Sequence, residues 1–145
     1  MRTRSRNRKW LITAIAATVI ALGAYWLVGA AGGADTGSAV TNSGPEAFMA
    51  ALRADPQAVL VDVRTPQEFA EGHLPGAVNV ELDRLEALAP TALPDRNAHL
   101  LVYCHSGNRS SFAVQILERM GYTRLVNMVG GIAAWSGEGY PVTRD

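Results

Sequence analysis

Hydrophobic and polar positions divide the chain into one long apolar run and, after it, alternating strand-like and helix-like segments. Short runs rich in β-branched residues predict strands at 58–63, 78–80, 100–103 and 125–128. Apolar residues at helical spacing and helix-start residues predict helices that begin near residues 45, 66, 82, 112 and 131. Because strands alternate with helices, the pattern favours an α/β fold built on a parallel sheet.

Helix-start and helix-stop residues set the bounds of several of these helices. Residues 43–46 and 65–68 both fit a capping box, in which a hydroxyl residue and a glutamate three positions later cap the first turn. The helix at 112–120 carries Phe112 on its apolar side and is followed by Gly121, a residue typical of the position after a helix. Two prolines within residues 90–94 predict a loop there.

The long apolar run indicates a membrane segment at the N-terminus. Residues 10–31 form 22 uncharged positions, enough for a helix to cross a hydrocarbon core of about 30 Å. Residues 1–9 hold five basic side chains, which should remain cytoplasmic. We therefore expect a single-pass helix in the inner or plasma membrane, with the C-terminal domain outside the cytoplasm, in the periplasm of a bacterium.

A cleaved signal peptide is the alternative to this anchor. The small residues before Asp35 would suit a cleavage site, and the product would be a soluble periplasmic protein. Residues 32–42 are small and polar without periodicity, and we interpret them as a flexible linker. Residues 43–145 then form the single folded domain.

Charge and cysteine content exclude several classes of function. The 13 basic and 13 acidic residues balance, but residues 10–145 hold 8 basic against 13 acidic side chains. A domain this acidic is a poor candidate for nucleic-acid binding. The chain has one cysteine, so an intramolecular disulfide, a Cys-x-x-Cys redox pair and a cysteine-rich zinc site are all excluded. We expect neither a metal nor a cofactor.

The cysteine itself lies where a reactive site is expected. Cys104 ends the predicted strand at 100–103, and the connection to the next helix contains Gly107, Asn108 and Arg109. Glycine and asparagine tolerate the backbone conformations that direct successive N–H groups inward, and such groups favour an anion. Each of these features stabilises a thiolate. A buried cysteine that acts only as a small hydrophobe is the alternative.

Five short motifs in this order resemble the single-domain rhodanese family of sulfurtransferases. They are the segments at 60–64, 68–69, 71–79, 103–110 and 130–135, with the sequences LVDVR, EF, EGHLPGAVN, YCHSGNRS and GGIAAW. The resemblance covers roughly residues 43–143. It implies a rhodanese-like fold, with a five-stranded parallel sheet flanked by helices, and a persulfide carried by Cys104.

The resemblance also assigns roles to individual residues. Cys104 and Arg109 are the expected catalytic residues. Residues expected to bind the donor are Arg64, His105, Ser106, Gly107 and Asn108. Arg64 could instead brace the catalytic loop. Structural support is expected from Asp62, His73 and Ser110; for His73 a role as catalytic base is the alternative. The implied substrates are a small thiosulfate-like anion as sulfur donor and cyanide or a thiol as acceptor.

Loop length separates the possible reactions. Cys104 and Arg109 are spaced as Cys-x4-Arg, whereas the cysteine phosphatases that resemble this family use Cys-x5-Arg. The shorter loop favours a single sulfur atom over a tetrahedral phosphate or arsenate. Two alternatives to the sulfurtransferase remain: a non-enzymatic persulfide or redox carrier that docks on a protein thiol partner, and a phosphatase-like or arsenate reductase-like enzyme.

Overall fold

One parallel sheet organises the part of the chain that the structure, a computed structural model, describes: residues 39–144. Its strands are β1 (Val40–Ser43), β2 (Val59–Asp62), β3 (Val78–Asn79), β4 (His99–Tyr103) and β5 (Arg124–Met128). They pair in the order β1-β5-β4-β2-β3, and every pair is parallel. The expected five-stranded parallel sheet is confirmed.

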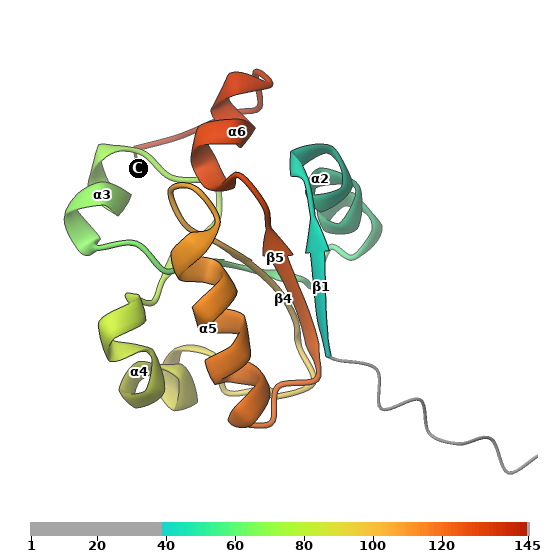
Figure 1. Cartoon of the computed structure of the whole chain (residues 1–145), viewed down its shortest axis with the longest axis vertical. Coiled ribbons are helices and arrows are strands. Elements are labelled where there is room, and N and C mark those ends of the chain that lie inside the picture. The colour runs from blue at the N-terminus through green and yellow to red at the C-terminus, as the bar shows by residue number, and fades with distance from the viewer. Residues whose placement is uncertain (1–38, 145) are drawn as a thin grey trace, which may run out of the picture. The chain divides into compact units, whose positions relative to one another are not determined.

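Helices cover both faces of this sheet (Figure 1). They are α2 (Pro45–Ala54), α3 (Pro66–Glu71), α4 (Leu85–Ala92), α5 (Asn108–Arg119) and α6 (Gly131–Gly137), with a short 3-10 turn at Leu82–Arg84 before α4. Side chains of α4 and α5 pack in the core on one face, and those of α2 and α6 pack on the other.

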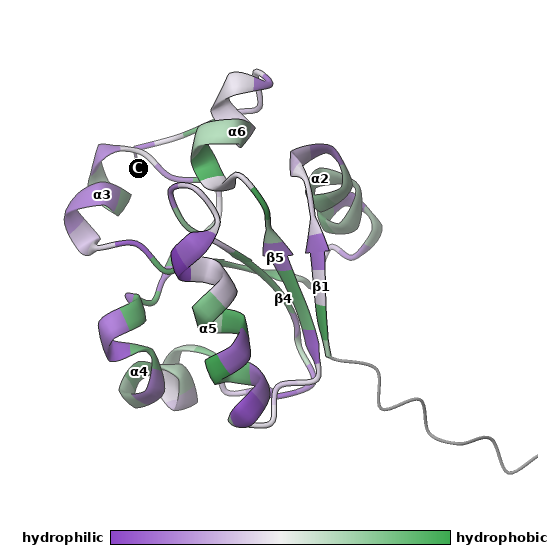
Figure 2. Ribbon diagram, in the orientation of Figure 1, coloured by the Kyte–Doolittle hydropathy of each residue, from purple (hydrophilic) through white to green (hydrophobic). Residues whose placement is uncertain are grey.

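Burial on both faces explains the continuous apolar run of the central strand. In β4, Leu100 and Val102 point into the core under α4 and α5, while Leu101 and Tyr103 point into the core under α2 and α6. All four side chains are fully buried. Figure 2 accordingly shows β4 as a hydrophobic strand inside the molecule. A strand with two buried faces has no polar alternation, as is typical of parallel sheets.

The edge strand β1 was not expected. It lies largely within the segment interpreted as a linker, 32–42, and pairs with β5 from Val40 to Ser43. The linker prediction is therefore wrong for residues 40–42. Two middle residues of β1 are exposed polar side chains, and the strand has a neighbour on one side only. A short polar edge strand carries almost no hydrophobic pattern from which it could be recognised.

Two helix boundaries also differ from the sequence prediction. The first helix starts after Gly44, and no side chain caps it, so the capping box predicted at residues 43–46 is wrong. Of the loop predicted at residues 90–94, residues 90–92 instead belong to α4, which contains Pro90. The buried Leu85 and Ala89 hold this helix in the core, and the hydroxyl of Tyr122 lies 2.7 Å from the carbonyl oxygen of Leu93 at its end.

The helix after Cys104 is longer than predicted and buries a different side. It begins at Asn108 rather than near residue 112, and its buried residues are Ser110, Ala113, Val114 and Leu117. Phe112, which was assigned to the apolar side, is 61% exposed. The capping box at residues 65–68 is confirmed, with Thr65 as the N-cap of α3.

Within residues 39–144, no helix combines the length and hydrophobicity that a membrane crossing requires. The predicted basic N-terminus, the transmembrane helix at 10–31 and most of the linker lie outside the described residues. The anchor and its orientation therefore remain predictions.

Candidate active site

Cys104 lies at the carboxyl end of the central strand, in the turn that joins β4 to α5. Gly107 is the N-cap of α5 and has φ +99°, a left-handed conformation that favours glycine. A Cβ atom on Gly107 would lie 3.0 Å from the backbone nitrogen of Gly130 and 3.3 Å from the carbonyl oxygen of Met128. Both backbone conformation and space thus require glycine at this position.

The thiol sulfur receives hydrogen bonds from the loop that follows it. The N–H group of Gly107 donates to Sγ of Cys104 at 3.1 Å, and the hydroxyl of Ser110 lies 3.5 Å from the same atom. Burial disfavours the thiolate, but the Ser110 hydroxyl and the N–H groups of Ser110, Gly107 and Ser106 outweigh burial. The pKa of Cys104 is therefore lower than that of an ordinary cysteine, as the sequence predicted.

The first turn of α6 binds the opposite side of the loop. The N–H group of Ile132 donates to the carbonyl oxygen of Cys104 at 2.8 Å, and that of Ala133 donates to the carbonyl oxygen of His105 at 3.1 Å. With these carbonyls bound by α6, N–H groups of the loop can face the sulfur. A Cβ atom on Gly131 would clash with both carbonyl oxygens, the one of His105 at 2.5 Å. The sequence pattern did not predict this contact, although the paired glycines at 130 and 131 were a signal for it.

Arg64 is not available to a donor anion. Its guanidinium donates to the carboxylate of Asp62 at 2.6–3.0 Å and to the carbonyl oxygen of Gly72 at 2.7 Å. Arg64 is 5% exposed and Asp62 is fully buried. These contacts contradict the expected donor-binding role of Arg64, and its hydrogen bond to the carbonyl oxygen of Gly72 joins the end of β2 to the end of α3. Asp62 is the ion-pair partner of Arg64.

Arg109 forms an ion pair that the sequence did not predict. Its two terminal nitrogens donate to the two carboxylate oxygens of Glu68, each at 2.7 Å. The hydrogen bonds from Arg109, together with those from Thr65, lower the pKa of Glu68 to about 2. The partners are 41 positions apart in the sequence and meet because α3 lies beside the loop after β4. Nothing in the local pattern of either residue indicates this contact.

Comparison with known proteins identifies this arrangement. The family model of the rhodanese-like domain matches residues 45–138. The chain belongs to the rhodanese-like family. The matched residues contain β4, the loop that follows it and α5.

Relatives of this rhodanese-like chain include sulfurtransferases. It is 40% identical over 70 residues to thiosulfate sulfurtransferase PspE of Escherichia coli (strain K12), which corresponds to 48% of this chain and 67% of PspE. It is 38% identical over 84 residues to a sulfurtransferase of Allochromatium vinosum, with 58% and 77% of the two chains covered. The solution structure of the rhodanese-like domain from the Anabaena protein Alr3790 superposes with a TM-score of 0.65 at 26% identity, covering 70% and 77%.

The remaining predicted site residues of this rhodanese-like domain divide into exposed and buried groups. His105, Ser106 and Asn108 are exposed around the loop, where a small anion can reach them. Ser110 is fully buried, and His73 is 4% exposed. Among residues 39–144, no group of three or more His, Cys, Asp or Glu side chains could hold a metal ion.

His73 packs between α3 and the C-terminal segment. Its imidazole stacks on the ring of Phe69 at 3.7 Å, and its Nδ1 lies 2.9 Å from the carbonyl oxygen of that residue. Its backbone pairs with Thr143 in an isolated antiparallel bridge. These contacts fix the segment after α3 against the C-terminal segment, and they argue for support rather than for a catalytic base.

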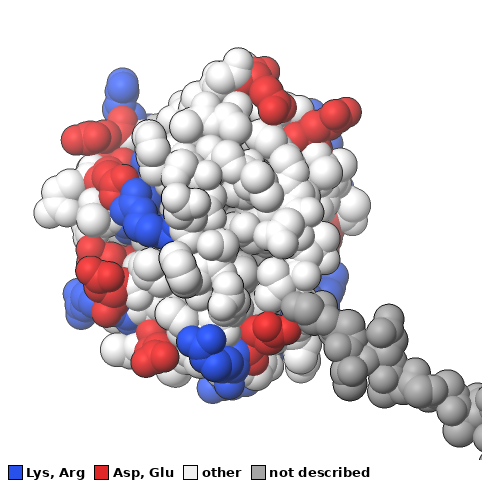
Figure 3. Space-filling model, viewed as in Figure 1, with Lys and Arg blue, Asp and Glu red and all other residues white. Residues whose placement is uncertain are grey.

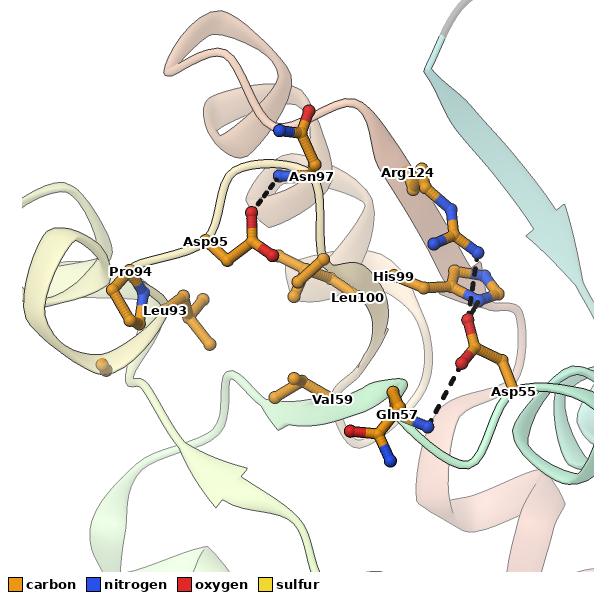
Figure 4. A pocket seen from close by; sticks show the side chains of 12 residues that line it. Asp55, Gln57, Val59, Leu93, Pro94, Asp95, Asn97, His99, Leu100 and Arg124 are labelled. Carbon is orange, nitrogen blue, oxygen red and sulfur yellow. Dashed lines mark hydrogen bonds and ion pairs between the residues drawn. The ribbon is translucent and has the colours of Figure 1, made fainter.

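A pocket of ≈ 390 Å³ lies at the amino-terminal ends of the strands, whereas Cys104 lies at their carboxyl ends. In Figure 4, Asp55 meets both His99 and Arg124 at one side of this pocket. The carboxylate of Asp55 lies 3.2 Å from Nδ1 of His99 and 3.0 Å from the guanidinium of Arg124. Asp55 therefore joins His99 at the start of β4 to Arg124 at the start of β5.

Proposed function

We propose that this rhodanese-like domain moves sulfane sulfur from a thiosulfate-type donor to cyanide or a thiol through a persulfide on Cys104. The observation that carries the proposal is the sulfur atom of Cys104 enclosed by the Gly107 N–H group and the Ser110 hydroxyl. These donors favour the thiolate, which is the form of cysteine that acts as a nucleophile. The sulfurtransferases among the relatives support the same chemistry.

The first step loads the cysteine. The thiolate of Cys104 attacks the outer sulfur of thiosulfate and forms a new S–S bond. The S–S bond of thiosulfate breaks, and sulfite leaves with the electron pair, so the persulfide remains on Cys104 as an anion. Loop donors that already bind Sγ, from Gly107 and Ser110, stabilise the charge that develops on the transferring sulfur.

The second step removes the terminal sulfur from the Cys104 persulfide. Cyanide or a thiolate attacks the terminal sulfur of the persulfide, the S–S bond to Cys104 breaks, and the cysteine returns as a thiolate. With cyanide the product is thiocyanate. The exposed side chains of His105, Ser106 and Asn108 are the ones that we assign to contact with the donor and the acceptor. Arg109 lies at the start of α5 and is held there by its ion pair with Glu68.

The test is thiocyanate formation from thiosulfate and cyanide by the purified protein, compared with its Cys104→Ser variant. We expect the variant to lose the activity, because the chain has no other thiol that could hold the sulfur. Thiocyanate formation by the serine variant would refute the mechanism. Hydrolysis of an aryl phosphate at a higher rate than thiocyanate formation would favour the phosphatase-like alternative.

Mass spectrometry separates the enzyme from the persulfide carrier. Incubation with thiosulfate should add about 32 Da to the protein, the mass of one sulfur atom on Cys104. Addition of cyanide should remove that mass and release thiocyanate through many cycles. Loading without turnover would indicate a carrier that passes its sulfur to a protein thiol.

A further inference from the structure

The charge near the Cys104 sulfur depends on two residues, Arg109 and Glu68. Arg109 is the only lysine or arginine from Cys104 through the first turn of α5. Both of its terminal nitrogens are bound to Glu68, and the two side chains are 36% and 30% exposed. The guanidinium is thus partly exposed to solvent, but its charge is paired with the Glu68 carboxylate.

Glu68 is held in place independently of Arg109. Its carboxylate accepts hydrogen bonds from the N–H group and the hydroxyl of Thr65, both at 3.1 Å, in the capping box of α3. The helix therefore fixes the carboxylate, and the carboxylate fixes the guanidinium. With a pKa of about 2, Glu68 is ionised at every pH at which a thiolate can form.

The pairing leaves the site without a net cation. The pair of Glu68 and Arg109 is neutral, and the Arg64 charge is neutralised by Asp62 inside the protein. Figure 3 shows few charged side chains over the middle of the face formed by α5, β5 and α6, with acidic and basic side chains intermixed at its border. The Cys104 thiolate repels a donor in proportion to the negative charge of the donor, and neither paired arginine fully offsets that repulsion.

We infer that Glu68 determines donor specificity: by holding and neutralising Arg109, it disfavours highly charged donors relative to donors with the same sulfane sulfur and less charge. The inference rests on the proposed sulfur transfer. Thiosulfate, a dianion, brings three negative charges together with the thiolate. A thiosulfonate, which is a monoanion, brings two. In both cases the thiolate takes the outer sulfur, and sulfite or a sulfinate leaves with the electron pair.

The substitution that tests this role is Glu68→Gln. Glutamine also serves as the third residue of a capping box, and its amide oxygen can still accept a hydrogen bond from Arg109. The variant therefore keeps the helix cap and removes one charge. Glu71→Gln is the matched control, since Glu71 is an exposed glutamate at the other end of the same helix.

The first measurement does not depend on sulfur transfer. Iodoacetate and iodoacetamide alkylate the same thiolate, but only iodoacetate is an anion, so the ratio of their rates reports the charge near Cys104. We expect Glu68→Gln to raise the iodoacetate-to-iodoacetamide ratio roughly three- to tenfold at low salt, the range of one partly screened charge. Arg109→Gln should lower the ratio, and Glu71→Gln should leave it near the wild-type value. An unchanged ratio in Glu68→Gln would overturn the inference.

The second measurement uses the donors themselves. In Glu68→Gln the KM for thiosulfate should fall more than the KM for benzenethiosulfonate, while the kcat values change little, and added salt should reduce the difference. Equal effects on both donors would refute the specificity role. If the wild-type protein transfers no sulfur, the proposed function fails, but the alkylation ratio still decides whether Glu68 sets the charge at Cys104.

Discussion

Cys104 occupies a position where two opposing effects act on one sulfur atom. The residue is 1% exposed at the end of a buried strand, and burial alone favours the neutral thiol. Hydrogen bonds from Ser110 and from the backbone of the loop act in the other direction and prevail. The sequence could predict the second effect, because Gly107 and the strand-to-helix turn are visible in it. The donation from Ser110 requires the observed start of α5 at Asn108, which the pattern placed later.

Replacement of the Ser110 hydroxyl tests this balance. Ser110→Ala removes the hydroxyl that lies 3.5 Å from the sulfur and 3.1 Å from the carbonyl oxygen of Gly107, and we expect the Cys104 thiol pKa to rise, with less thiolate at neutral pH. The measurement is the rate of iodoacetamide alkylation as a function of pH. Ser111→Ala is the control, because the Ser111 hydroxyl donates to the carbonyl oxygen of Asn108 and not to the sulfur. The same pH profile in both variants would show that Ser110 does not tune the thiol.

At the scale of the elements, α6 acts as the support of the catalytic loop. Its first turn binds two loop carbonyl oxygens, and its residues Ile132 and Trp135 anchor it in the core beside α2. The sequence pattern predicted a helix that begins near residue 131. It could not predict that the helix binds the loop, since that contact joins residues about 28 positions apart through backbone atoms.

The glycine at the start of α6 is the point at which this support is most easily broken. Gly131→Ala places a Cβ against the carbonyl oxygens of Cys104 and His105 at φ +57°, where the backbone atoms cannot move aside without displacing the loop. We expect a loss of roughly 2–4 kcal/mol in the free energy of unfolding, together with a loss of sulfur transfer.

Urea unfolding measures the loss of stability in Gly131→Ala, and thiocyanate formation measures its loss of sulfur transfer. Gly137→Ala in the same helix is the control, because a Cβ there meets no atom within 4 Å. That variant should be neutral or slightly more stable. Equal stability of the Gly131 and Gly137 variants would contradict the supporting role of α6.

On the scale of the whole molecule, parallel strands bring residues from distant segments together at the carboxyl ends of the strands. Asp62 and Tyr103 are register partners at the ends of β2 and β4, so the braced Arg64 segment and Cys104 lie at the same edge. Sequence order alone predicts this convergence once the strands are known to be parallel. It does not predict which side chains pair there. For that reason the sequence assigned Arg64 to donor binding and did not identify Glu68 as the partner of Arg109.

The N-terminal segment sets where this chemistry takes place, and its prediction concerns the full chain. Residues 10–31 are long enough to span a membrane, and the five basic residues before them should stay in the cytoplasm. Because β1 begins at Val40, at most residues 32–39 connect the predicted helix to the sheet. If this connection behaves as a coil, as we expect, its reach of roughly 14–17 Å would keep the folded domain close to the membrane.

Outside the cytoplasm a low-pKa cysteine is exposed to oxidation. We therefore expect a membrane-bound thiol protein as the partner that reduces Cys104 or receives its sulfur. Expression in bacteria, cell fractionation and protease treatment of spheroplasts test this topology. We expect the full-length protein in the membrane fraction, with residues 39–144 accessible to external protease. Protection of this domain would overturn the orientation. A soluble periplasmic product that begins near Asp35 would instead show that the segment is a cleaved signal peptide.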